Sequence, residues 1–209
     1  MEHNYPYIFD GMNAFEREVK RWFDFGVSFI FLILSSPLFL ICYIMIKRED
    51  KDGPVIYKQE RIGRFGRPFT IYKFRSMKED AEKNGPELCN QENEDRLTNA
   101  GKFLRSHHLD ELPQLWNVLK GDMSFVGPRP ERKFYIDQIM KHDCRYKYLY
   151  QIRPGVTSYA TLYNGYTDTM EKMLKRLEMD LDYLKRRSWW EDLKIMFLTV
   201  THVAVGKKF

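Results

Sequence analysis

The longest apolar stretch of the chain runs from residue 27 to residue 46 and contains no charged side chain. Its length, about 20 residues, is just enough for a helix to cross the core of a bilayer. Pro37 follows Ser36 near the middle of the stretch, and a proline inside a helix removes a hydrogen bond and bends the axis. Two possibilities stay open: a kinked helix that spans the membrane, and a re-entrant helix that bends at Ser36 and Pro37 and returns. Basic residues, which prefer the cytoplasmic side, flank both ends: Lys20 and Arg21 precede the stretch, and Lys47, Arg48 and Lys51 follow it.

Two segments with the composition of β-strands follow, residues 55–62 and 69–76. The intervening residues 63–68 contain two glycines and a proline, so the three segments together predict a β-hairpin. Residues 77–94 are highly charged and predict a mobile excursion. Basic side chains recur along the hairpin and indicate either a solvated face or a cradle for phosphate groups; they are Lys58, Arg61, Arg64, Arg67, Lys73 and Arg75.

The second half of the chain has the apolar spacing of helices. Residues 133–150 predict one helix, and residues 156–166 predict a loop or a strand. Asp168 and Glu171 form a possible capping pair for a helix whose stripe of Met and Leu residues predicts core packing. Ser188 opens a last helix, which has two tryptophans at its start. That helix suits either the headgroup layer of a membrane or the core of the domain.

The segment from residue 106 to residue 131 contains the candidate chemistry. Asp110 and Glu111 stand just before Pro113, so a helix should begin near Asp110 and end at Gly121. An aspartate in this place most often caps the helix, but the same end of a helix also suits a phosphate. The helix should bury an apolar face made of Leu112, Leu115, Trp116 and Leu119.

Composition narrows the choice of partners. The chain has 209 residues and a net charge of +5, which suits an anionic partner such as a nucleotide, a phospholipid surface or a nucleic acid. Three scattered cysteines make no disulfide framework or zinc spacing, and no secretory signal is evident. His107 and His108 have no second pair at ligand spacing, which argues against a transition metal. Mg²⁺, held by a carboxylate and substrate phosphates, needs no histidine.

Several segments, taken in order, resemble one family, the bacterial sugar transferases or monotopic phosphoglycosyl transferases. The resemblance extends from about residue 20 to the end of the chain. It rests on the basic pair and the SSP motif of the apolar stretch and on four further motifs: GPVIYKQERIGRFGRPFTIYKFRSM, RLTNAGKFLR, LDELPQLWNVLKGDMSFVGPRPE and RPGVTS.

The resemblance implies an α+β, mainly helical fold. It consists of a lead-in over residues 1–19, a re-entrant membrane helix over residues 20–48, and a compact catalytic domain over residues 49–209 with a small β-hairpin and interfacial helices. The implied location is the cytosolic face of the bacterial inner membrane. The implied reaction moves a sugar-1-phosphate from a UDP-sugar to polyprenyl (undecaprenyl) phosphate, with Mg²⁺ as cofactor and release of UMP. Downstream glycosyltransferases are possible partners, since the step begins a surface glycan.

The same resemblance assigns roles to individual residues. Asp110 matches the family's nucleophile, which also contacts the metal, and Glu111 matches its acidic partner, which assists the acceptor phosphate or the metal. Ser36 and Pro37 match the membrane kink. Phosphate and nucleotide contacts are expected from Lys73, Arg75, Arg105 and Arg129.

Two rival functions are compatible with the residues. One is a membrane-associated, magnesium-dependent phosphohydrolase that uses Asp110 with water as the acceptor. The other is a membrane-anchored basic binding module without enzymatic activity. Nucleic acid is disfavoured as a partner because the basic residues flank carboxylates and form no uninterrupted patch with stacking aromatics. The segment after Gly155 departs from the family's GLAQVNGR-like run, so the donor sugar is left open.

Overall fold

The apolar stretch forms two helices in the computed structural model, which describes residues 7–78, 96–165 and 167–205. Helix α1 (Ala14–Leu34) begins at a capping box in which Asn13 and Glu16 satisfy each other's backbone N–H groups. Helix α2 (Ser36–Glu49) follows after a single residue. The two axes are bent by 59°, so the predicted interruption of the apolar stretch is confirmed as a bent helix pair.

Ser35 lies at the bend, and its hydroxyl Oγ donates a hydrogen bond of 2.5 Å to the carbonyl of Phe31. Pro37 occupies the first turn of α2, where its missing N–H leaves no intrahelical bond unmade. Within the described ranges, no single helix is long and apolar enough to cross a bilayer, whereas the bent pair together meets that length and composition.

The predicted hairpin is confirmed. Strand β1 (Ile56–Ile62) pairs antiparallel with β2 (Pro68–Phe74), and Gln59 lies opposite Ile71. A second, parallel pair joins β3 (Ser124–Val126) to β4 (Gly155–Thr157). The predicted excursion over residues 77–94 lies almost entirely outside the described residues.

The remaining elements are helical and confirm the α+β, mainly helical class. They are α3 (Asn99–Ser106), η3 (Leu109–Glu111), α4 (Gln114–Lys120), α5 (Lys133–His142), η4 (Cys144–Gln151), α6 (Tyr159–Tyr163), α7 (Met170–Arg186) and α8 (Trp189–Ala204). A short 3-10 turn, η1 (Arg64–Gly66), closes the hairpin.

The main hydrophobic core forms around α7, as its apolar stripe predicts. Met173, Leu177 and Leu184 are all buried, and they pack with residues of α5 and η4. The cap of α7 is one residue later than predicted: Thr169 is extended and accepts a hydrogen bond from the N–H of Lys172. Asp168 was the wrong candidate because its carboxylate pairs with the Lys172 ammonium at 2.7 Å.

Residues 156–166 differ from the prediction in their second part. Gly155–Thr157 form β4, but Tyr159–Tyr163 form the short helix α6. The side chain of Ser158 caps this helix by accepting a hydrogen bond from the N–H of Thr161. A serine at this spacing is an N-cap signal, and the β-branched and aromatic residues after it concealed the signal.

The predicted apolar face of α4 is wrong. The buried residues of α4 are Gln114, Asn117 and Val118, while Trp116 is 49% exposed. Asn117 determines this orientation because its amide donates to the carbonyl of Thr70 and accepts from the N–H of Tyr72. The helix therefore docks on the free edge of β2 through a polar side chain.

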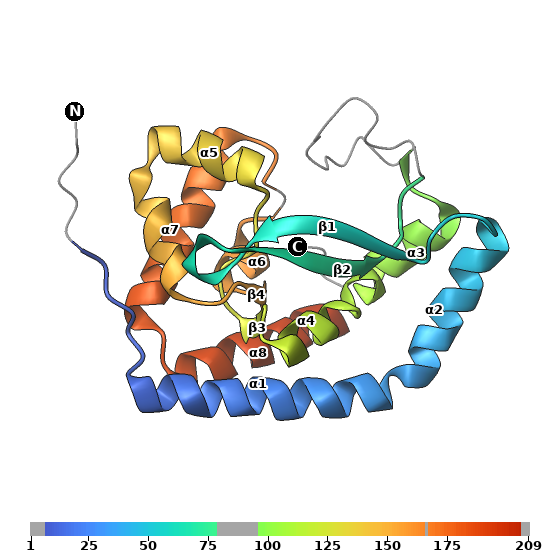
Figure 1. Cartoon of the computed structure of the whole chain (residues 1–209), viewed down its shortest axis with the longest axis horizontal. Helices are drawn as coiled ribbons and strands as arrows, with labels where there is room; N and C mark the ends of the chain where they lie inside the picture. Colours follow the sequence, from blue (N-terminus) through green and yellow to red (C-terminus); the bar gives the residue numbers. More distant parts are fainter. Residues whose placement is uncertain (1–6, 79–95, 166, 206–209) are drawn as a thin grey trace.

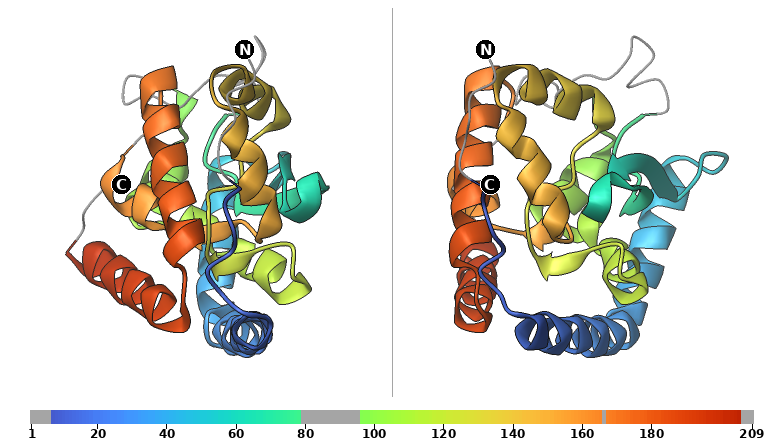
Figure 2. Two further views of the ribbon diagram at one scale, coloured as in Figure 1. Left: turned by 90° about the vertical axis from the view of Figure 1, so that its left-hand side faces the viewer. Right: turned by 60° about the vertical axis from the view of Figure 1, so that its left-hand side comes forward.

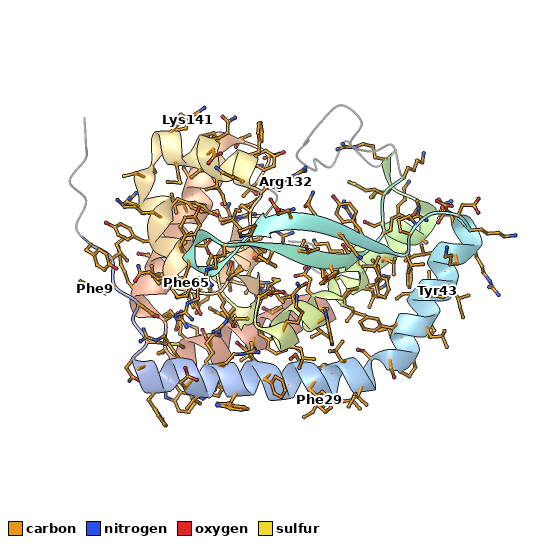
Figure 3. The ribbon with its side chains drawn as sticks, viewed as in Figure 1. Phe9, Phe29, Tyr43, Phe65, Arg132 and Lys141 are labelled. Carbon is orange, nitrogen blue, oxygen red and sulfur yellow. The ribbon has the colours of Figure 1, made fainter. Side chains whose placement is uncertain are left out.

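Helices α1 and α2 form an L along two sides of the molecule (Figure 1). Helix α4 lies beside α1, α3 lies near the far end of α2, and α8 lies near the same edge as α1 (Figure 2). Large apolar side chains are exposed on these outer helices, among them Phe29 and Tyr43, which are labelled in Figure 3. Others are Trp22, Phe25, Ile30, Ile33 and Leu34 on α1, Leu40, Ile41 and Ile44 on α2, and Trp190, Phe197 and Val200 on α8.

Candidate active site

Asp110 and Glu111 lie in the short turn η3, between α3 and α4. The chain enters this turn through His108, which has a left-handed backbone with φ of 55°. Asp110 is inside the turn and caps neither neighbouring helix, because the C-cap of α3 is His107 and the N-cap of α4 is Pro113. The N-cap alternative for Asp110 is therefore wrong.

Glu111 is the most strongly paired carboxylate of the turn. Its Oε1 accepts a hydrogen bond of 2.6 Å from Lys73 Nζ and a longer one of 3.5 Å from Arg129 Nη2. Burial raises the pKa of Glu111, but the charges of Lys73 and Arg129 outweigh burial and lower it to about 2. Glu111 is therefore a fixed anion that holds both cations beside Asp110.

Asp110 has a different environment from its neighbour. Its residue is only 7% exposed, and within the described part of the chain no group donates a hydrogen bond to its carboxylate. Burial raises the pKa of Asp110, the Lys73 charge opposes that rise, and the Glu111 charge adds to it. The carboxylate is thus weakly solvated and unpaired among the described residues; burial disfavours its ionised, nucleophilic form, and the nearby cations favour that form.

Three of the four predicted phosphate-binding residues lie near the turn, and the fourth, Arg75, is turned away from it. Lys73 and Arg129 contact Glu111 directly. Arg105 lies at the end of α3, donates from Nε to Ser76 Oγ at 3.0 Å, and lowers the pKa of Asp110 through its charge. Arg75 is turned toward the loop after α2, where its Nη1 lies 2.7 Å from the Asp50 carboxylate.

A close approach of two loops holds Arg129 in place. Gly127 donates its N–H to the carbonyl of Thr157, and Gly155 donates to the carbonyl of Pro128. A Cβ atom on Gly155 would lie 2.1 Å from the backbone nitrogen of Gly127, so only glycine permits this contact. The rigid loop that carries Arg129 is thereby attached to the small parallel sheet.

Behind Arg129 lies a charged cluster that the sequence analysis did not identify. The Glu131 carboxylate accepts 2.7 Å and 3.4 Å hydrogen bonds from Arg176 and Arg61. Arg129, Glu131, Arg176 and Asp180 line a small cavity together with apolar residues of α5 and α7. The spacing of Arg176 and Asp180 is the signal that could have revealed the cluster, because both lie on the buried face of α7.

The metal-binding capacity of the turn is limited. Within residues 7–78, 96–165 and 167–205, no three His, Cys, Asp or Glu side chains are grouped so as to hold a metal ion. Of the two carboxylates in the turn, Asp110 is the one that has no ion-pair partner among the described residues. Mg²⁺ is commonly bound by one or two carboxylates together with substrate phosphates, so Asp110 fits that type of site.

Comparisons with known proteins agree with the motifs. The sequence model of one family, described as Bacterial sugar transferase, matches residues 15–206. A UDP-glucose:undecaprenyl-phosphate glucose-1-phosphate transferase of Klebsiella pneumoniae is 44% identical over 203 residues, which are 96% of this chain and 43% of that protein. A UDP-N-acetylgalactosamine-undecaprenyl-phosphate N-acetylgalactosaminephosphotransferase of Aeromonas hydrophila is 39% identical over 188 residues, covering 90% of this chain and 44% of that protein.

A third relative has a length similar to that of this chain. The uncharacterized sugar transferase EpsL of Bacillus subtilis is 38% identical over 189 residues, which are 90% of this chain and 89% of that protein. The chain therefore spans less than half of the Klebsiella and Aeromonas relatives and most of the Bacillus one.

Proposed function

Because this chain belongs to the bacterial sugar transferase family, we propose that it transfers a sugar-1-phosphate from a UDP-sugar to polyprenyl phosphate. The names of the Klebsiella and Aeromonas relatives support a UDP-sugar donor and an undecaprenyl phosphate acceptor. The observation that carries the proposal is the contrast within the turn η3. Asp110 is buried and unpaired among the described residues, whereas Glu111 beside it is neutralised by Lys73 and Arg129.

In the first step, an oxygen of the Asp110 carboxylate attacks the β-phosphorus of the donor. A bond forms between that oxygen and phosphorus, and the bond to the bridging oxygen breaks, so that UMP leaves with the bridging oxygen. In the second step, a phosphate oxygen of the acceptor attacks the same phosphorus. This step forms the lipid diphosphate sugar and returns the Asp110 carboxylate.

Cations around the turn match the charge that these steps must stabilise. Glu111 holds the Lys73 ammonium and the Arg129 guanidinium close to Asp110, and Arg105 adds a third positive charge. Asp110 would hold Mg²⁺ together with the donor's phosphate oxygens, and the bound ion would neutralise charge on the diphosphate. A nearby cation also lowers the pKa of a buried carboxyl, which favours the ionised form of Asp110.

We further propose that the bent pair α1 and α2 is re-entrant and that lipid covers its exposed apolar side chains. Exposed Phe29 and Ile41 on this pair and Trp190 and Phe197 on α8 support contact with an apolar medium. The basic residues at both ends of the pair support the same side for both ends, the cytosolic face of the bacterial inner membrane. The acceptor's phosphate would then meet Asp110 at headgroup depth, and the product would pass to downstream glycosyltransferases.

The test measures UMP release and lipid-linked product from UDP-sugars, with and without polyprenyl phosphate. Asp110→Asn should lower both by about 10⁴-fold or more, because it removes the attacking oxygen's charge. Asp137→Asn, a change at an exposed carboxylate on α5, is the matched control and should keep full activity. Free sugar phosphate without lipid product would indicate a phosphohydrolase instead.

A trapping experiment tests the covalent step by itself. The protein, mixed with donor labelled in the sugar phosphate and with no acceptor, should carry the label on the peptide that contains Asp110. An unlabelled protein that still forms lipid product would contradict the two-step reaction.

A further inference from the structure

The bent helix pair touches both helices that flank the catalytic turn. Helix α1 runs beside α4, which follows Glu111, and the far end of α2 lies beside α3, which precedes Asp110 (Figures 1 and 2). Each contact includes one charged side chain that bonds backbone groups at a helix end, and apolar packing between Ile46 of α2 and Leu104 of α3 adds to the second contact. The turn η3 therefore connects two helices, α3 and α4, that are both bonded to the bent pair.

The first anchor is Arg21 of α1. Its Nη1 donates to the carbonyl of Val118 at 2.8 Å, and its Nη2 donates to the carbonyl of Leu119 at 2.7 Å. These carbonyls belong to the last turn of α4, where the helix leaves acceptors unsatisfied and its dipole favours a cation. Arg21 thus attaches the C-terminal end of α4 to the first membrane-facing helix.

The second anchor is Glu49, the last residue of α2. Its two carboxylate oxygens accept hydrogen bonds from the N–H groups of Asn99 and Ala100, each at 2.7 Å. These are the first two residues of α3, whose third N–H is satisfied by the side chain of Thr98. Glu49 thus attaches the N-terminal end of α3 to the second membrane-facing helix.

A displacement of α3 would also displace the turn η3. Gly101 packs so closely on the segment that follows β2 that a Cβ atom there would lie 1.9 Å from the carbonyl oxygen of Ser76. Arg105, one helical turn later, donates to the side chain of the same Ser76. Only three residues separate the end of α3 from Asp110, so a tilt of α3 displaces both Arg105 and Asp110.

We propose that Arg21 and Glu49 are positioning residues that couple the bend between α1 and α2 to the placement of Asp110. The inference rests on the proposed function, because the activity it modulates is the sugar phosphate transfer. The apolar side chains exposed on the bent pair make its angle depend on the surrounding lipid. Through the two anchors, the angle between α1 and α2 sets the positions of α4 and α3 on either side of the turn. Asp110 is therefore placed for attack on the donor only when the bent pair adopts the correct angle in the membrane.

The test compares Glu49→Gln and Arg21→Gln with the wild type in lipid nanodiscs, with kcat and KM for the UDP-sugar as readouts. Each change should lower kcat by about 10- to 100-fold and leave KM within about twofold, since it misplaces the attacking group without removing a donor contact. Arg186→Gln, at an exposed position of α7, and Glu18→Gln, at an exposed position of α1, are the matched controls and should keep wild-type kcat.

Two further variants separate positioning from simple stabilisation. Arg21→Lys keeps the charge and one donor, so its kcat should fall between those of the wild type and Arg21→Gln. The double variant Glu49→Gln, Arg21→Gln should lose less than the product of the two single losses, because both changes act on one turn.

Thermal unfolding is measured on every variant. An unchanged kcat together with a lower unfolding midpoint would overturn the inference, since the two residues would then only stabilise the fold. If Arg21→Gln does not fold, an unchanged kcat in both Arg21→Lys and Glu49→Gln would overturn it equally. Absence of lipid product from the wild type itself would instead contradict the proposed function.

Discussion

The burial of Asp180 predicts that the stability of the fold decreases as the pH rises toward neutrality. Its residue is 3% exposed on the inner face of α7, and its Oδ1 accepts no hydrogen bond from a described residue. Burial raises the pKa of Asp180 from 3.8 to about 7, although the Arg176 charge and a hydrogen bond to Ser158 oppose the rise. The folded protein therefore keeps a proton on Asp180 under conditions in which the unfolded chain loses it.

The sign and magnitude follow from this difference in pKa. Below pH 3.8 both states are protonated and the group has no effect on the pH dependence. Between pH 3.8 and about 7 only the unfolded state ionises, so stability falls as the pH rises. From pH 5 to pH 7 this loss is about 2 kcal/mol, because the slope of about 1.4 kcal/mol for each pH unit falls to half as the pH reaches the folded pKa.

The assay is denaturant unfolding in a fixed detergent micelle, followed by tryptophan fluorescence at pH 5 and pH 8. Asp180→Asn removes the ionisation, so its stability relative to the wild type should rise by about 3 kcal/mol between the two pH values. Asp182→Asn, two residues along α7 with a side chain that is 61% exposed, is the control and should show no such rise. An Asp180→Asn variant that differs from the wild type equally at both pH values would refute the reasoning.

Two further predictions concern the outer helices. Asp192→Asn should lower the free energy of unfolding by about 3 to 5 kcal/mol, because the buried Lys20 ammonium loses the carboxylate that lies 2.5 Å away and keeps only the charge of Asp24 nearby. A loss below about 1 kcal/mol in denaturant unfolding would contradict a buried pair. In a variant without its native cysteines, Glu18→Cys and Asp52→Cys should both react with a membrane-impermeant thiol reagent from the same side, since a re-entrant pair returns to the side it entered; labelling from opposite sides would restore a spanning helix.

Local patterns in the sequence predict much of the fold. The turn residues between two β-rich segments predict the hairpin, the apolar stripe predicts the buried face of α7, and Ser188 predicts the start of α8, where it caps the helix by accepting from Glu191. Each of these features depends on residues within a few positions of one another. The adjacency of Asp110 and Glu111 is local in the same sense, although the helix predicted to begin near Asp110 begins at Gln114, after the turn that holds the pair.

The position of Asn117 shows where local patterns fail. The apolar spacing in α4 predicted that Trp116 would be buried, yet the amide of Asn117 meets the free edge of β2, which lies 45 residues away at Tyr72, and turns the helix. Unpaired backbone groups of an edge strand need partners, and no periodicity in α4 reveals that such an edge will be near.

The sequence by itself therefore determined the hairpin, most of the long helices and the pair of carboxylates that is candidate chemistry, but not the helix α6. Only the tertiary structure decided that Lys73, 38 residues away, and Arg129, 18 residues away, meet at Glu111 while Asp110 stays unpaired among the described residues. It also decided that Arg21 and Glu49 anchor the two helices around the turn. Periodicity records which side of an element is apolar, whereas burial, pKa and long-range hydrogen bonds depend on elements that meet only when the chain is folded.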